Sequence, residues 1–539
     1  MKTNLLSLLF ASSILIITSC KNQASDYKTI NSDVLKDKIA GGWAGKMIGV
    51  TYGAPTEFKA QGKMFTDSIK WKPSDVKGSM SQDDIYVQLT FMMTMDKYGI
   101  QAPAKVFQEM FAKAGYPLWH ANVQSRKNYY DSIFAPQSGM PENNFHADDI
   151  DFQIESDYIG FISPGMPQTA IKMADKVGHI MNYGDGVYGG IFVAALYSQA
   201  FFSNDIPTII ENALRSIPAE SDYYKIIKDV IKLHKHYPDA WEAAWIELEA
   251  KWDDTDICGA GSPFNIDAKF NGAFIVMGLL YGNGDPIKTM NITTKCGQDS
   301  DCNPSNAMAL LGVIYGFSKL PADFTRGVTE YKDSIFINTD YSFSKAVENT
   351  YNYALGNIQN GGGIVSGKNI KVKIQEPVPP AIEISFPNVV YDSTVTVFEK
   401  NLWKFTGSWQ TISRKPRNGG NSVNVSKWSD KKGDMVEFTF DGTGISLTGT
   451  WDKEGGKADI YVDNKFDRTI DTYFNYNNQQ YGTTSIWHKL NLSQGTHKVR
   501  VEIKGEKRAE SAGTRINLAN ALVFITAPKK NESYKFSFE

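Results

Sequence analysis

Apolar side chains recur every three to four residues through the first two-thirds of the chain. One clear stripe is formed by Tyr223, Ile226, Ile227, Val230 and Ile231. A 3.6-residue period is typical of helices that bury one face against a core. We therefore predict a largely α-helical unit over residues 32–357.

The pattern changes after residue 357. Three glycines at 361–363 and three prolines between 377 and 380 stand where neither a helix nor a central strand continues. We therefore predict a linker over residues 358–388. Beyond it, polar and apolar residues alternate in short runs separated by turn residues, which indicates an antiparallel β-sandwich over 389–528. The expected fold is an all-α domain followed by an all-β, jelly-roll-like sandwich.

The N-terminal segment has the features of an export signal. Lys2 precedes an apolar run over residues 5–17, and small residues lead to Cys20. This pattern predicts a lipoprotein signal peptide over residues 1–20, with lipidation of Cys20; a plain secretory signal with an incidental cysteine is the alternative. We expect a lipid-anchored protein of the bacterial cell envelope, on the periplasmic or cell-surface face of the outer membrane. No other stretch reaches the ~18 apolar residues of a membrane span, so the anchor is the expected membrane contact.

Composition narrows the possible functions. The 539 residues are 42% hydrophobic and 21% charged, with a formal net charge of −3, which suits a globular chain with more than one folding unit. This charge predicts no basic surface for nucleic acid. The cysteines that follow the signal, Cys258, Cys296 and Cys302, lack the short ligand spacing of a structural zinc cluster, so the sequence does not predict one.

Two acidic motifs stand next to predicted helix starts. Asp83 and Asp84 follow Ser81, a natural N-cap, while Asp299 and Asp301 precede a helix that begins at Asn303-Pro304. If the two helix starts meet, four carboxylates converge and require a divalent cation, for which Mg²⁺ or Mn²⁺ is the natural choice. Acids that only complement the helix dipole, worth ~0.3–1 kcal/mol each, are the alternative.

These motifs occur in a recognisable order. A glycine-rich helix at 41–49 leads into Gly53-Ala54-Pro55-Thr56-Glu57, then the paired aspartates, then the Gly-x-Asp-x-Asp loop at 297–301. The order resembles the ADP-ribosylglycohydrolase family over residues 35–330. The resemblance implies an all-α fold with a binuclear Mg²⁺ or Mn²⁺ centre that hydrolyses glycosidic bonds at ADP-ribose. The metal ligands that it implies here, for one or two ions, are Gln82, Asp83, Asp84, Asp299, Asp301 and Cys302.

The chain departs from the family pattern in several places. Gln82 and Cys302 stand where the family has Thr, and Val50 stands where it has Asp. A thiol is a poor ligand for a hard cation, so one of the two ions is expected to bind weakly or not at all. A densely acidic segment at 148–157 replaces a segment that carries an Arg in the family, and this disfavours a diphosphate. We therefore expect a glycan or glycoside rather than ADP-ribose.

The same reasoning assigns roles to single residues. A glycosidase needs carboxyl groups that transfer protons at the bond it cleaves, so Asp84, Asp299 and Glu155 are predicted to be catalytic. Acidic residues at 148–157 that only form a solvated helix face, and a packed core histidine at 179, are the alternatives. The predicted substrate contacts are Glu57, Asp149, Asp157, His179, Asn182, Tyr183 and Asp185.

The C-terminal part is similar to the carbohydrate-binding β-sandwiches found beside glycoside hydrolases. Tryptophan side chains stack on sugars when they are exposed, although most of those in this part are expected in the core. The predicted function is a metal-dependent hydrolase that cleaves a glycosidic bond in an extracytoplasmic glycan or glycoside. A true ADP-ribosyl glycohydrolase and a non-catalytic glycan-binding lipoprotein are the alternatives.

Overall fold

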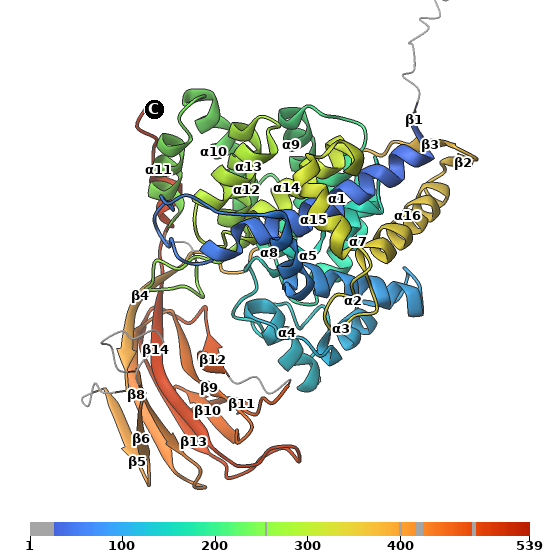
Figure 1. The fold of residues 1–539 in the computed structure, drawn as a ribbon. Coiled ribbons are helices and arrows are strands. Elements are labelled where there is room, and N and C mark those ends of the chain that lie inside the picture. Colours follow the sequence, from blue (N-terminus) through green and yellow to red (C-terminus); the bar gives the residue numbers. More distant parts are fainter. Residues whose placement is uncertain (1–25, 254–255, 398–401, 415–423, 477–480) are drawn as a thin grey trace, which may run out of the picture.

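A computed structural model describes residues 26–253, 256–397, 402–414, 424–476 and 481–539. The predicted signal peptide and Cys20 lie outside the described residues. The fold class expected from the sequence is confirmed: helices form the first part of the chain and antiparallel sheets the second (Figure 1). None of the helices in the described residues has the length and apolar character needed to cross a membrane.

The helical part holds sixteen α-helices among the described residues. They are α1 (Ser32–Gly53), α2 (Asp83–Tyr98), α3 (Ala104–Lys113), α4 (His120–Tyr130), α5 (Asp151–Glu155), α6 (Asp157–Phe161), α7 (Pro167–Gly178), α8 (Asp185–Ala200), α9 (Ile206–Leu214), α10 (Asp222–His236), α11 (Trp241–Trp252), α12 (Ala268–Gly282), α13 (Pro286–Lys295), α14 (Cys302–Tyr315), α15 (Ala322–Tyr331) and α16 (Phe343–Asn360). The amphipathic stripe predicted at 223–231 lies on α10, and all five of its apolar residues are buried.

Helix α1 forms the centre of this part and is buried from Gly41 to Gly53. A Cβ atom at Gly45 would lie 2.3 Å from the carbonyl oxygen of Met308, and one at Gly49 would lie 2.3 Å from that of Pro304. Glycine at these positions therefore lets α1 and α14 pack backbone against backbone. This close packing brings the C-terminal end of α1 beside the loop that precedes α14.

The second part is a sandwich of two antiparallel sheets. One sheet has the strand order β11-β10-β13-β8-β5, and the other has the order β12-β9-β14-β7-β6, with β4 (Val389–Thr396) also paired to β14. The other strand bounds are β5 (Trp403–Thr406), β6 (Gln410–Arg414), β7 (Asn424–Ser429), β8 (Met435–Gly442), β9 (Gly444–Trp451), β10 (Lys457–Val462), β11 (Lys465–Asp471), β12 (Tyr481–Lys489), β13 (Gly495–Ile503) and β14 (Ile516–Thr526). Trp403, Trp451 and Trp487 are buried, in agreement with the expectation that most tryptophans here belong to the core.

The stretch 358–388 contacts the helical part along its length. It begins with the end of α16 and continues into β2 (Ile364–Ser366) and β3 (Asn369–Lys373), which form a three-stranded sheet with β1 (Tyr27–Asn31). The Gln375 side chain then accepts a hydrogen bond from the Thr169 amide at 2.8 Å. The predicted limits of the two domains and of the linker stay a prediction.

Candidate functional site

The chain brings its acidic motifs together at the ends of three elements. Glu57 follows the C-terminal end of α1, Asp83 and Asp84 form the first turn of α2, and Asp299 and Asp301 lie in the loop before α14. We call these five residues the acidic centre. Carboxylate oxygens of Glu57, Asp299 and Asp301 lie within 4.8 Å of one another, and ligand atoms of Asp84, Asp301 and Cys302 do the same. The two groups share Asp301.

Local hydrogen bonds explain why the segment around Glu57 lies against the loop that precedes α14. The amide of Phe58 donates to the carbonyl of Gln298 at 3.1 Å, and the hydroxyls of Thr56 and Ser300 lie 2.8 Å apart.

The half-buried Gln82 is the N-cap of α2, where the sequence had suggested Ser81. No side-chain cap bond is formed at this helix start.

The acidic centre concentrates negative charge in a poorly hydrated volume. Asp299 and Asp301 are buried, and the Oδ1 atom of each has no hydrogen-bond partner. Burial, followed by the charges of Asp299 and Glu57, raises the pKa of Asp301 well above its usual value. Loss of hydrating water, with the charges of Asp299 and Asp84, raises the pKa of Glu57 to about 7. Burial and the charges of Asp84 and Asp299 likewise raise the pKa of Asp83.

One cation of the protein itself reaches this centre. Lys46 of α1 is fully buried, and its Nζ lies 3.1 Å from Oδ1 of Asp84 and 3.0 Å from Oδ2 of Asp157. It also donates a 2.7 Å hydrogen bond to the carbonyl of Ile154. Burial opposes its charge, but Asp157 and Asp84 outweigh burial and raise the pKa of Lys46. Lys46 is not among the residues predicted from the sequence, although it is the charged residue within the otherwise apolar, glycine-rich stretch 39–50.

Cys302 lies inside the centre as a neutral thiol. Its Sγ donates to Oδ2 of Asp84 at 3.1 Å, and burial together with Asp299 and Asp301 raises its pKa well above the usual value. Cys258, Cys296 and Cys302 are all free cysteines. The thiol therefore contacts the predicted ligands without tying the loop to another cysteine.

Two predicted functional acids lie beneath the centre rather than at its surface. Glu155 is fully buried and accepts a hydrogen bond from the Asn122 side chain, while burial and then Asp151 raise its pKa well above the usual value. Asp157 is also fully buried and accepts a 2.7 Å hydrogen bond from the Tyr197 hydroxyl. The protein encloses both carboxyls, and their predicted roles toward a substrate stay predictions.

Four other predicted substrate residues are used in the protein's own packing. Nε2 of His179 lies 3.0 Å from Glu383, and the buried Asn182 side chain donates to the Asp149 carbonyl at 2.8 Å. Asp185 accepts from the Tyr223 amide at 3.1 Å, and the Tyr183 carbonyl accepts from Ser385 at 2.9 Å. These contacts lie within the protein's own packing, and the assignment of the four residues to the substrate stays a prediction.

Asp149 belongs to a different group of side chains. Its Oδ2 lies 2.8 Å from Nδ1 of His146 and 3.5 Å from Nδ1 of His120, and the Cys258 thiol donates to the same oxygen at 3.3 Å. We call His120, His146, Asp149 and Cys258 the histidine cluster. Burial opposes protonation of His120, but its hydrogen bond to Asp149 and the charge of that residue raise the pKa to about 9. Sequence spacing did not reveal this group, because His120 and Cys258 lie far along the chain from His146 and Asp149.

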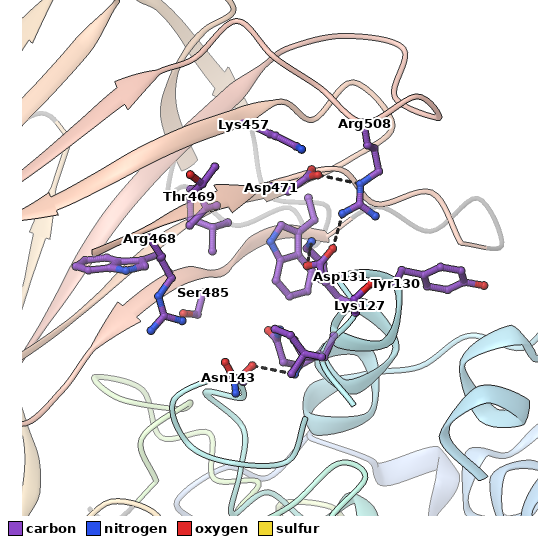
Figure 2. Close-up of a pocket in the computed structure, with 18 of the residues that line it drawn as sticks. Lys127, Tyr130, Asp131, Asn143, Lys457, Arg468, Thr469, Asp471, Ser485 and Arg508 are labelled. Carbon is purple, nitrogen blue, oxygen red and sulfur yellow. Dashed lines mark hydrogen bonds and ion pairs between the residues drawn. The ribbon is translucent and has the colours of Figure 1, made fainter. Parts of the chain in front are cut away.

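A pocket of about 540 Å³ lies between α4 and the β-sandwich. Figure 2 shows Lys127 of α4 and Asp131, which directly follows this helix, on one side of the pocket, and Arg468 of β11 and Arg508 on the other. The Arg508 guanidinium pairs with Asp131 across the two parts of the chain. The pocket wall is therefore polar and is built jointly by the helical part and the sandwich.

Comparison with known proteins places the helical part in a family. Residues 31–349 match the family model described as ADP-ribosylglycohydrolase. No curated protein matches the chain. A solved ADP-ribosylglycohydrolase-related protein complex shares 12% identity over 60% of this chain and 99% of its own, with a TM-score of 0.42. A CBM36 carbohydrate-binding module in complex with calcium and xylotriose shares 13% identity over 25% of this chain and 99% of its own, with a TM-score of 0.16.

Proposed function

The chain belongs to the ADP-ribosylglycohydrolase family, and on that premise we propose that it is a metal-dependent hydrolase of a glycosidic bond in an extracytoplasmic glycan or glycoside. The observation that carries the proposal is the pair of ligand groups that share Asp301. These groups supply the ligand atoms that a metal-dependent hydrolase of this family needs to bind its cation.

The donor chemistry of the acidic centre suits Mg²⁺ or Mn²⁺. Glu57, Asp299 and Asp301 offer only carboxylate oxygens, and Oδ1 of Asp299 and of Asp301 is buried without a partner. Hard divalent cations prefer such oxygens, and their charge offsets the repulsion among the carboxylates. When bound, the cation supplies a positive charge that polarises an oxygen of the substrate or of water.

Glu57 is the carboxyl group that we assign to proton transfer. It is the exposed member of the acidic centre, so substrate reaches it. Without a cation its pKa is raised to about 7, so this carboxyl group can take up and release a proton near neutral pH. Lys46 acts behind it by holding Asp84 through a buried ion pair.

The charge around the centre supports a neutral sugar as substrate. The acidic centre carries the carboxylates of Glu57, Asp299 and Asp301, so a diphosphate would meet negative charge there unless a cation offsets it. The polar pocket between α4 and the sandwich is a place where further sugar units of a glycan could form hydrogen bonds (Figure 2). An ADP-ribosyl substrate is the second candidate, because the family match includes it by name.

The location of this activity is part of the proposal. Lipidation at Cys20 would hold the enzyme at the cell envelope, where glycans are available and intracellular ADP-ribose is not. Replacing Cys20 with Ser should release the protein from the membrane fraction of the expressing bacterium. Retention of the variant in that fraction would contradict the anchor and leave the enzymatic proposal intact.

The enzymatic proposal is tested with the chain that lacks residues 1–20. It is incubated with Mg²⁺ or Mn²⁺ and with panels of aryl glycosides and ADP-ribosyl substrates. We expect turnover of a glycoside, a loss of about 10²–10⁴-fold in kcat/KM for Glu57→Gln, and loss of both activity and cation binding for Asp301→Asn. Asp323→Asn is the matched control, because Asp323 is an exposed acid in the first turn of α15.

Each other outcome has a defined meaning. Turnover of the ADP-ribosyl substrates alone would replace the glycan proposal with the second candidate. Glycan binding without turnover would identify a binding protein. Full activity in the presence of a chelator, or in Asp301→Asn, would refute the role of the acidic centre.

A further inference from the structure

The histidine cluster is a compact set of metal-ligating atoms outside the acidic centre. Ligand atoms of His120, His146, Asp149 and Cys258 all lie within 4.8 Å of one another. They come from the start of α4, the segment before α5, and the loop between α11 and α12. Nothing in the acidic centre requires two imidazoles and a thiol at this position.

The contacts within the cluster converge on one carboxylate. The two imidazoles and the thiol approach Oδ2 of Asp149 at 2.8–3.5 Å. The other oxygen of Asp149, Oδ1, is buried without a hydrogen-bond partner. A fully buried carboxylate with an unsatisfied oxygen costs free energy unless a cation or another donor reaches it. Oδ1 of Asp149 is therefore the atom that a cation or a further donor would satisfy.

We propose that His120, His146, Asp149 and Cys258 bind a zinc ion. Two neutral imidazoles, one carboxylate and one thiolate are four ligands of the kind that tetrahedral zinc takes, and their two negative charges balance the ion. Mg²⁺ and Mn²⁺ prefer all-oxygen sites, so the cluster and the acidic centre select different metals. The proposal does not rest on the proposed function.

A zinc ion here would fix the loop that supports the acidic centre. Cys258 lies in the same loop as Asn265, whose amide donates to the Gln298 side chain at 3.0 Å. The Gln298 side chain in turn donates to the carbonyl of Pro263 at 2.9 Å. Gln298 directly precedes Asp299. These hydrogen bonds therefore connect the loop that carries Cys258 to the loop before α14. Tying Cys258 to His120 and His146 would anchor the loop from its other side.

The test uses cobalt as a spectroscopic substitute for zinc. Purified protein is stripped of metal, titrated with Co²⁺, and followed by the thiolate-to-cobalt charge-transfer band and the visible bands of tetrahedral cobalt. We expect one equivalent to produce these bands and one equivalent of Zn²⁺ to abolish them. Cys258→Ser should remove the charge-transfer band.

Cys302→Ser is the matched control, because Cys302 is the thiol at the acidic centre. It should leave the band unchanged. A band that survives Cys258→Ser and vanishes in Cys302→Ser would overturn the proposal, and so would the absence of a band in the wild type.

A second measurement tests the zinc site even if Cys258→Ser does not fold. Zn²⁺ should protect Cys258 of the wild-type protein from alkylation, as read by peptide mass spectrometry, and His146→Ala should remove that protection. Equal alkylation of Cys258 with and without Zn²⁺ would overturn the proposal.

Discussion

The strongest stability prediction concerns the buried ammonium of Lys46. In Lys46→Met the chain keeps a side chain of similar length but loses the positive charge between Asp84 and Asp157. All three side chains are fully buried, with Nζ–O distances of 3.1 and 3.0 Å. Removing one partner of a buried ion pair costs about 3–5 kcal/mol, because the remaining charge is left without a partner. Two carboxylates share Lys46, so we expect the upper part of this range in metal-free protein.

The assay is urea denaturation of the chelator-treated protein, followed by helical circular dichroism. Lys36→Met is the matched control, because Lys36 lies on the same helix and pairs with Glu348 where both side chains are about half exposed, at 45% and 51%. An exposed pair contributes about 0–1 kcal/mol. Asp157→Asn added to Lys46→Met should recover part of the loss, because it removes one of the stranded charges.

A loss below about 1 kcal/mol for Lys46→Met, equal to that of the Lys36→Met control, would refute the reasoning. It would mean that Asp84 and Asp157 take up protons at no cost when Lys46 is absent. No recovery in the double variant would show that Lys46 acts through packing and not through charge.

Three further predictions address the metal, the thiol and the helix contact. Protons compete with a cation for Glu57, whose pKa is about 7, so the Mg²⁺ affinity measured by calorimetry should rise as the pH rises through 7; an unchanged slope in Glu57→Gln would contradict this. Cys302→Thr should tighten Mg²⁺ binding because it replaces a thiol with a hydroxyl oxygen, and unchanged affinity would show that Cys302 only packs against Asp84. Gly45→Ala should lower the thermal midpoint of unfolding, because its Cβ would lie 2.3 Å from a carbonyl oxygen. Gly356→Ala on α16 is the control: its Cβ meets no atom within 4 Å, so this substitution should raise the midpoint. Equal shifts in the two variants would refute the close contact between α1 and α14.

The sequence predicted the fold class because each part has a clear period. Helical spacing covers the chain up to α16, and alternation follows in strands such as β8 and β13. The acidic centre was also predictable, because both aspartate pairs lie next to helix starts and the glycines of α1 let this helix pack closely against α14. Local patterns succeed where one element determines the position of a side chain.

Other parts of the site depend on contacts that no local pattern records. Lys46 and Asp157 are far apart in the chain and meet only because α1 crosses the helical core. His179 looked like a substrate residue, yet its partner is Glu383, in a stretch that the sequence indicated as a linker. Such pairings follow from tertiary packing, so spacing within a motif could neither reveal nor exclude them.

Asp84 differs from the other carboxylates of the acidic centre, because its counter-charge belongs to the protein. Lys46 lies 3.1 Å from one of its oxygens, and the Cys302 thiol donates to the other at 3.1 Å. Glu57, Asp299 and Asp301 instead have one another as neighbours, and these like charges add to burial in raising the pKa of Glu57 and Asp301. One end of the centre is therefore fixed by the fold, whereas the other end changes its charge with protons or metal. Substitution of Lys46 should for that reason change stability even in metal-free protein, whereas substitution of Glu57 should mainly change cation binding and catalysis.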